Sequence, residues 1–372
     1  MTESSGAHFP ISSLAPKHRA LLLLMLVSLA AFTVAKLLPA QGGSTITGAG
    51  ADAAAMMARA MTVIREDFVS HGGHFDDAID PNHTALVGEE YTELTSTLGS
   101  LEAKRTTTNP NAAALVVQLL KEAGVTAGDT IAVGCSGSFP ALAVATLSAS
   151  KTLGIYPIVI LSIGASSFGA TRVDQTLLDI YEVVRHRTDL KFPAVAASLG
   201  GADDIGADFE AGVKEKLIEK IRNSGIPFLY ESNLGKNVSQ RMQLYCGASS
   251  KRRIAAFVNI GGSYADLGTS PLILKLEPGV NKEMTIPAQE ETQGVVFAMA
   301  KRHIPVIHLL HIKGLALKYG LPWDPIPLPP ISSVRSQRDS ATPLATAVTG
   351  AYFVSVILIV VYYRKAFFRK YS

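Results

Sequence analysis

The residues most suited to binding or catalysis are a group of glycines and serines. Residues 134–138 read Gly-Cys-Ser-Gly-Ser, between a β-branched, apolar run and an Ala/Leu-rich segment that opens at Pro140. This order is typical of a strand, a tight turn and a helix N-terminus, where proline suits the first turn. The backbone N–H groups of such a turn bind anions, and a serine placed on it, here Ser136, is also a candidate nucleophile.

Three further apolar runs end in the same residue types, at residues 164–167, 200–203 and 261–263. A single turn of this kind needs glycine for steric reasons alone and does not indicate a site. Four of them together are more informative, because parallel strands place their carboxyl ends at one edge of the sheet, where ligands bind. We therefore expect one anion-binding pocket lined by backbone and hydroxyl groups. Its predicted lining is Gly134, Gly137, Ser138, Ser166, Ser167, Thr171, Gly201, Gly262 and Ser263.

A basic pair precedes the helix expected from residue 111. Lys104 and Arg105 stand beside three threonines at the end of a polar, threonine-rich stretch. Two such cations can hold carboxylates or phosphates, and we expect them at the rim of the pocket if this stretch folds over it. The alternative is a basic pair exposed to solvent.

The nucleophile hypothesis for Ser136 competes with a pure binding role. The sequence around it departs from the Gly-x-Ser-x-Gly pattern of a nucleophile elbow. His308 and His311 lie near the last predicted strand, but neither is clearly assigned as a base for Ser136. Both interpretations therefore stay open.

Several other classes of site are not expected. The chain has 372 residues and a net charge of +3, and its basic residues do not cluster as in nucleic-acid-binding proteins. No Walker motif or Cys-x-x-Cys spacing occurs, so neither ATP, a metal nor another cofactor is expected. His71 and His74 are interpreted as flanking a glycine-rich helix end, with metal binding as the alternative. Cys135 and Cys246 are expected as small buried residues, although an external domain would also permit a disulfide.

Helix and strand patterns alternate between residues 111 and 330. This alternation predicts an α/β domain with a mostly parallel, Rossmann-like sheet. Residues 39–110 should hold a packed helix at 51–70 and then an irregular, threonine-rich region. The predicted strands are residues 131–133, 158–163, 193–197, 228–230, 254–260 and 306–310, with 272–276 at an edge.

Apolar segments stand near both ends of the chain. Residues 20–38 and 343–363 are long enough to cross a bilayer core of about 30 Å. Basic residues flank both on the side of the chain ends, which predicts cytoplasmic tails at residues 1–19 and 364–372 and an extracytoplasmic central domain. A linker is expected at residues 331–342. The alternative for the first segment is a signal peptide cleaved near Ala40.

Three longer segments carry a resemblance to a known family. Residues 104–116, 128–142 and 164–171, which include Lys-Arg-Thr-Thr-Thr-Asn-Pro-Asn and Gly-Ala-Ser-Ser-Phe-Gly-Ala-Thr, look like the poly-γ-glutamate system protein family. The resemblance extends over most of the chain, from about residue 51 to residue 325. It transfers no catalytic residues.

The resemblance implies a partnership with the poly-γ-glutamate synthase, an ATP-dependent amide ligase with a small membrane partner. We therefore expect a membrane-anchored accessory protein of the cell envelope, involved in making or exporting this polymer. Its partners would be the synthase subunits, the lipid bilayer and the anionic γ-glutamyl chain. The alternative is an extracytoplasmic serine hydrolase or transferase that acts on γ-glutamyl chains through Ser136.

Overall fold

The computed structural model describes residues 15–37, 48–249, 253–331 and 343–363. The chain divides into two compact units, Met1–Gly43 with Ser336–Ser372, and Ser44–Arg335. Both predicted tails fall largely outside the described residues, as do nearly all of the predicted linker and the alternative cleavage site near Ala40.

The larger unit is organised around a six-stranded sheet in the order β5-β3-β2-β6-β8-β7. All neighbouring strands pair in parallel, except that β7 runs antiparallel to β8. The prediction of an α/β fold with a mostly parallel sheet is thus confirmed. The strands are β2 (Thr130–Ser136), β3 (Tyr156–Ser162), β5 (Ala194–Ser198), β6 (Ile254–Ile260), β7 (Gly279–Asn281) and β8 (Val306–Leu309).

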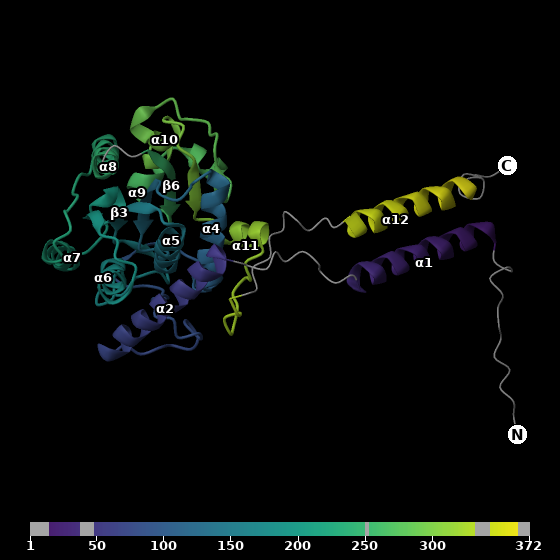
Figure 1. The fold of residues 1–372 in the computed structure, drawn as a ribbon, viewed down its shortest axis with the longest axis horizontal. Helices are drawn as coiled ribbons and strands as arrows, with labels where there is room; N and C mark the ends of the chain where they lie inside the picture. The colour runs from purple at the N-terminus through teal and green to yellow at the C-terminus, as the bar shows by residue number, and fades with distance from the viewer. Residues whose placement is uncertain (1–14, 38–47, 250–252, 332–342, 364–372) are drawn as a thin grey trace, which may run out of the picture. The chain divides into compact units, whose positions relative to one another are not determined.

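Helices cover both faces of this sheet (Figure 1). One face packs against α2 (Ala49–Ser70), α4 (Asn111–Ala123), α5 (Pro140–Leu153), α6 (Leu177–Arg187), α7 (Ala211–Asn223) and α11 (Ile312–Tyr319). The other face packs against α8 (Leu234–Ala248), α9 (Tyr264–Leu267) and α10 (Val295–Ala300). The helix predicted at residues 51–70 therefore packs on the α/β core, as expected.

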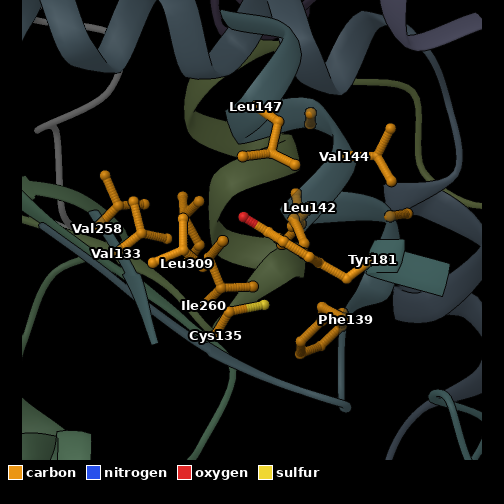
Figure 2. Close-up of a cluster of buried hydrophobic side chains, with 14 of the residues drawn as sticks. Val133, Cys135, Phe139, Leu142, Val144, Leu147, Tyr181, Val258, Ile260 and Leu309 are labelled. Carbon is orange, nitrogen blue, oxygen red and sulfur yellow. The ribbon is translucent and has the colours of Figure 1, made fainter. Parts of the chain in front are cut away.

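Burial on both faces explains why the strands are continuously apolar. All seven residues of β2 are buried, and so are all seven of β6. Alternate residues of β2 contribute to different cores: Val133 and Cys135 to the face with α5, and Ala132 to the face with α8. Figure 2 shows the first of these cores, where Phe139, Leu142 and Tyr181 from the helix side meet side chains of β2, β6 and β8.

Three local predictions were wrong. The Lys-Arg-Thr-Thr-Thr segment is helical and not irregular, because Ser100 caps the N-terminus of α3 (Leu101–Thr107) by accepting from the Ala103 N–H at 3.2 Å. The stretch expected as an edge strand at residues 272–276 belongs to the 3₁₀ helix Pro271–Lys275, capped by Ser270. The third wrong prediction is the strand at residues 228–230, where the structure has only an isolated bridge between Phe228 and Ala197.

Both edges of the main sheet are short or covered. β7 contributes only three residues at one edge. At the other edge, the Ala197 N–H donates to the Pro227 carbonyl and the Leu229 N–H donates to the Ala197 carbonyl, each at 2.9 Å. A separate two-stranded sheet pairs β1 (Thr95–Thr97) with β4 (Ala165–Ser166), outside the main one.

The smaller unit contains α1 (Pro16–Leu37) and α12 (Pro343–Tyr362). The hydroxyl groups of Ser28 and Tyr352 join these helices by a hydrogen bond of 3.2 Å. Within the described residues, one helix is long and apolar enough to cross a membrane, over Pro16–Val34, whereas the apolar stretch Thr349–Tyr362 is shorter. A second membrane crossing therefore stays a prediction.

The two cysteines are free and differ in burial. Cys135 is buried as expected, but Cys246 is exposed, so the prediction of two buried residues was half wrong.

The helix α2 ends at Ser70, and Gly72 follows with φ of 84°, consistent with a glycine-rich helix end between His71 and His74. No cluster of three or more potential metal-ligating side chains was found among the described residues.

A buried ion pair fastens the loops at the carboxyl edge of the sheet. Arg241 on α8 and Asp204, which follows β5, are both fully buried, and their Nη2 and Oδ2 atoms lie 2.7 Å apart. Ser162, Ser198 and Asn237 also donate to Asp204. The Arg241 Nη1 atom is 3.5 Å from Oδ1 of buried Asp266 on α9, whose pKa burial raises above its usual range. The network thus joins the ends of β3 and β5 to α8 and to α9, which follows β6.

Replacing Arg241 should be strongly destabilising, because it leaves the Asp204 carboxylate buried without a counter-charge. We expect Arg241→Met to lower the free energy of unfolding by about 3–5 kcal/mol. The exposed Arg222, on α7, provides the matched control, and Arg222→Met should change it by less than about 0.5 kcal/mol. Chemical denaturation of the full-length protein in detergent measures both. Equal shifts in the two variants would contradict this account.

Candidate functional site

The carboxyl edge of the sheet reverses its winding between β2 and β6. The chain moves from β2 to β3 and β5 on one side, and returns to β6 and β8 on the other. In open α/β sheets this switch point is where ligands bind. Ser136 ends β2 here, and its Oγ donates to the Ile260 carbonyl at 3.3 Å. A Cβ at Gly261, whose φ is +79°, would collide with that hydroxyl, so only glycine fits.

The surroundings of Ser136 do not resemble those of an activated nucleophile. In the described part of the chain, its hydroxyl contacts the Ile260 carbonyl and the Ser138 N–H, and no base. His308 instead lies 3.1 Å from the Asn259 side chain, and burial lowers its pKa to about 4. His308 is therefore neutral at pH 7 and bonded elsewhere.

The most unusual cation of the unit is Lys104, on α3. Its residue is 2% exposed, so it is buried and does not lie at a solvent-exposed rim as the sequence suggested. Its Nζ donates to the Ser138 carbonyl and, at 2.7 Å, to the Ser166 Oγ, and lies 3.8 Å from the centroid of the Phe139 ring. We call Lys104, Ser138, Phe139 and Ser166 the Lys104 centre.

The Lys104 centre contains no acid. None of the ion pairs among the described residues includes Lys104. Burial lowers the pKa of its ammonium group from 10.5 to about 7, because the low-dielectric surroundings disfavour the charged form. A buried, uncompensated cation of this kind is a characteristic of functional sites.

Two of the predicted serines hold the Lys104 centre together. The Ser166 N–H donates to the Ser138 Oγ at 3.1 Å, which ties β4 to the turn after β2. Ser136 is one hydrogen bond further away, through the Ser138 N–H at 3.4 Å. The structure therefore brings together Ser136, Ser138, Ser166 and Lys104, which are four of the residues predicted for the anion-binding pocket and its rim.

Close packing against neighbouring atoms accounts for two of the predicted glycines. The Gly137 N–H donates to the carbonyls of Ser162 and Gly164 at 3.0 and 3.1 Å, and a Cβ at Gly137 would collide with the Ile163 carbonyl. Gly134 lies within β2 and not in a loop, and a Cβ there would collide with the Asp266 carboxylate. Both glycines shape the edge of the sheet, so a bulky residue at either position would disturb the fold as well as any ligand.

The remaining predicted residues lie in separate contacts. Ser167 and Thr171 hold the threonine-rich stretch: the Ser167 N–H donates to the Thr97 carbonyl and the Thr171 Oγ1 donates to the Glu89 carbonyl, both at 2.9 Å. Ser263 caps α9 and donates to Asp266 at 2.8 Å. Gly201 faces Asp208 and Phe209, and Gly262 faces Leu267 and Leu310.

Arg105 does not join its neighbour in the Lys104 centre. Its guanidinium makes two hydrogen bonds to Asp324, of 2.6 Å from Nε and 2.7 Å from Nη2. The carboxylate of Asp324 neutralises it, and the pair fixes the proline-rich segment to α3. The two adjacent basic residues therefore have different environments, and only Lys104 lacks an acidic partner.

Sequence reasoning missed the network around Arg241. Arg241 is found on the stripe of α8 that also buries Val238, Met242 and Tyr245. A charged residue at a position of the apolar face was the available signal, because such a residue must find a buried counter-charge. The sequence did not mark Asp204 as the partner of Arg241. Its unusual backbone is visible only in the structure, where Asp204 and Asp203 adopt positive φ values of 60° and 54°.

Comparisons with known proteins do not identify a family for this chain. A scan against models of protein families found no match, and neither did searches of curated proteins and of solved structures.

The pKa of Lys104 predicts how stability depends on pH. Between pH 7 and 10.5 the unfolded chain keeps a proton on Lys104 that the folded chain has released, so raising the pH favours the folded state. Below pH 7 both states hold the proton and this dependence vanishes. The free energy of unfolding of the unsubstituted protein should therefore rise, relative to Lys104→Met, by up to about 1.4 kcal/mol per pH unit.

Denaturation of both proteins between pH 6 and 10 checks this expectation. The comparison cancels the other titrating groups, which the two proteins share. A constant difference between them across this range would mean that Lys104 keeps its ordinary pKa.

Proposed function

We propose that this chain is a membrane-anchored accessory protein of poly-γ-glutamate biosynthesis or export that binds the anionic polymer at the Lys104 centre. The observation that carries the proposal is the buried Lys104 ammonium group, which is held by neutral groups and paired with no carboxylate of the described residues. An anionic ligand would supply the missing counter-charge.

A γ-glutamyl chain suits this site chemically. It carries a free carboxylate on every residue, and a carboxylate forms short, charge-assisted hydrogen bonds with an ammonium group. The hydroxyls of Ser138 and Ser166 are further donors beside Lys104. The resemblance of residues 104–116, 128–142 and 164–171 to the poly-γ-glutamate system protein family supports the choice of polymer, and the Lys104 centre draws residues from all three segments.

Access to the site would pass the segment of residues 95–100, which we call the strap. Gly99 packs against Ser166 and Ser167, and a Cβ there would lie 3.2 Å from the Lys104 Cε. Leu98 next to it is 80% exposed, so its side chain contributes little to holding the strap closed. Opening of the strap would expose the ammonium group to a polymer carboxylate.

The membrane anchor is proposed to have two spans, α1 and α12. The length and composition of Pro16–Val34 support the first span. For the second, residues 343–363 carry no charge, and Arg364 and Lys365 follow them directly. Basic flanks at both chain ends favour cytoplasmic termini and an extracytoplasmic α/β unit. In that compartment the domain would meet the polymer that the synthase releases.

The two-span topology predicts that reporters report opposite sides of the membrane. A reporter fused after Gly50 should be extracytoplasmic, and one fused after Ser372 should be cytoplasmic, because basic flanks retain both ends inside. Alkaline phosphatase and a fluorescent protein that requires the cytoplasm measure the two sides in the same host. Reporters found on one side would rule out this topology.

Polymer binding should depend on the charge of Lys104. We expect Lys104→Met to weaken the affinity for an oligo-γ-glutamate about 10- to 100-fold at pH 6, the value of a hydrogen bond to a charged group. The exposed Lys216, on α7, gives the control Lys216→Met, which should bind as the unsubstituted protein does. The affinity of the unsubstituted protein should fall as the pH rises above about 7, since deprotonation removes the charge of Lys104. Calorimetric titration of the full-length protein in detergent provides these numbers, and equal weakening by both substitutions would reject the site.

A further inference from the structure

The contact between Lys104 and Ser166 also places an amine beside a serine hydroxyl. The Lys104 Nζ is 2.7 Å from the Ser166 Oγ, which is within direct proton-transfer distance. Among the serines near the end of β2, the hydroxyl of Ser136 donates to a carbonyl and that of Ser138 accepts from a backbone N–H. Ser166 has the hydroxyl that contacts the amine.

The environment of this amine fits a general base. A lysine acts as a base when burial favours its neutral form and when no carboxylate holds the proton on it. Lys104 meets both conditions, and its pKa of about 7 gives a substantial neutral fraction at neutral pH. The Phe139 ring, 3.8 Å away, excludes water from one side of the nitrogen.

We propose that Ser166 and Lys104 form a serine–lysine catalytic dyad for acyl transfer, with Ser166 as the nucleophile and Lys104 as the general base. The substrate class, the amide bond of a γ-glutamyl chain, rests on the function proposed above, whereas the dyad itself rests on the geometry of the two side chains. The nucleophile that the sequence suggested, Ser136, is replaced in this proposal by a serine from the next turn.

The reaction balances with water as the only co-reactant. The Ser166 oxygen attacks the carbonyl carbon of the amide and passes its proton to the neutral Lys104 amine. The tetrahedral intermediate then collapses, the C–N bond breaks, and the Lys104 ammonium group returns the proton to the departing nitrogen. Water attacks the resulting ester, again giving a proton to Lys104, which transfers it to the Ser166 oxygen as the C–O bond breaks. The products are a carboxylic acid and an amine.

The surrounding elements can stabilise the charge that develops. The helix α5 begins at Pro140, directly after the turn that contains Ser138, and a helix N-terminus favours negative charge. Ser166 is 7% exposed and the strap lies over it, so the substrate would enter as the strap opens. The same opening would then serve binding and catalysis.

A fluorophosphonate provides the test, because it phosphonylates an activated serine hydroxyl with loss of fluoride. Incubation with the full-length protein in detergent should add one phosphonyl group, which peptide mass spectrometry should locate on Ser166. The rate should rise about tenfold per pH unit up to about pH 7 and then level off, following the neutral fraction of Lys104. Ser166→Ala and Lys104→Met should each slow labelling at least a hundredfold. Ser239→Ala, at an exposed serine of α8, should label at the unsubstituted rate.

The outcomes separate the dyad from the binding function. Labelling should become faster up to about pH 7 and then stay constant, whereas binding of the polymer should weaken above pH 7. Ser166→Ala should weaken polymer binding less than Lys104→Met does, because it removes a hydroxyl donor and leaves the charge of Lys104 in place. Labelling of Ser166 without any polymer affinity would keep the dyad and reject the binding function. An unlabelled protein, a label on Ser136 or Ser138, or an unchanged rate in Ser166→Ala would each overturn the dyad.

Discussion

The ion pair between Arg241 and Asp204 is the interaction on which the carboxyl edge of the sheet depends. Both groups are fully buried, and the 2.7 Å contact gives each a counter-charge that offsets the cost of removing it from water. Their partners come from the ends of β3 and β5 and from α8, and the guanidinium also faces Asp266 on α9. Elements distant in the sequence are thereby held in one arrangement. The turns that carry the predicted pocket are built on this arrangement.

The Lys104 centre differs from this network in that its buried cation has no acidic partner among the described residues. Arg241 is buried and compensated, whereas Lys104 is buried among hydroxyl, carbonyl and aromatic groups. The first arrangement stabilises the charged form, and the second destabilises it, as the direction of the pKa shift of Lys104 records. A fold that keeps an uncompensated ammonium group gives up stability there, which is typical of a functional position. The proposals concern this centre because its charge is left available to a ligand or a reacting proton.

Much of the architecture could be read from local patterns. Continuous apolar runs identified the buried parallel strands, and Gly124 and Gly154, which end α4 and α5 with positive φ, marked the helix ends. Less of the site was predictable, because it depends on contacts between distant segments. Ser166 lies 62 residues from Lys104, and no periodicity or spacing reveals that their side chains meet. The helix α3 was missed for a related reason: threonine has a low intrinsic helix propensity, which burial of Thr106 and Thr107 overrides.

The edges of the sheet limit how this protein can associate. An open strand edge offers unpaired N–H and carbonyl groups that recruit a strand from another chain. Here the segment of residues 227–229 already satisfies Ala197 at the β5 edge, and β7 offers only three residues at the other. Backbone-mediated addition of a peptide strand or of a second copy is therefore disfavoured on both sides. Association of the larger unit across the main sheet would then depend on side-chain surfaces, where specificity is encoded residue by residue and not in the shared geometry of the main chain.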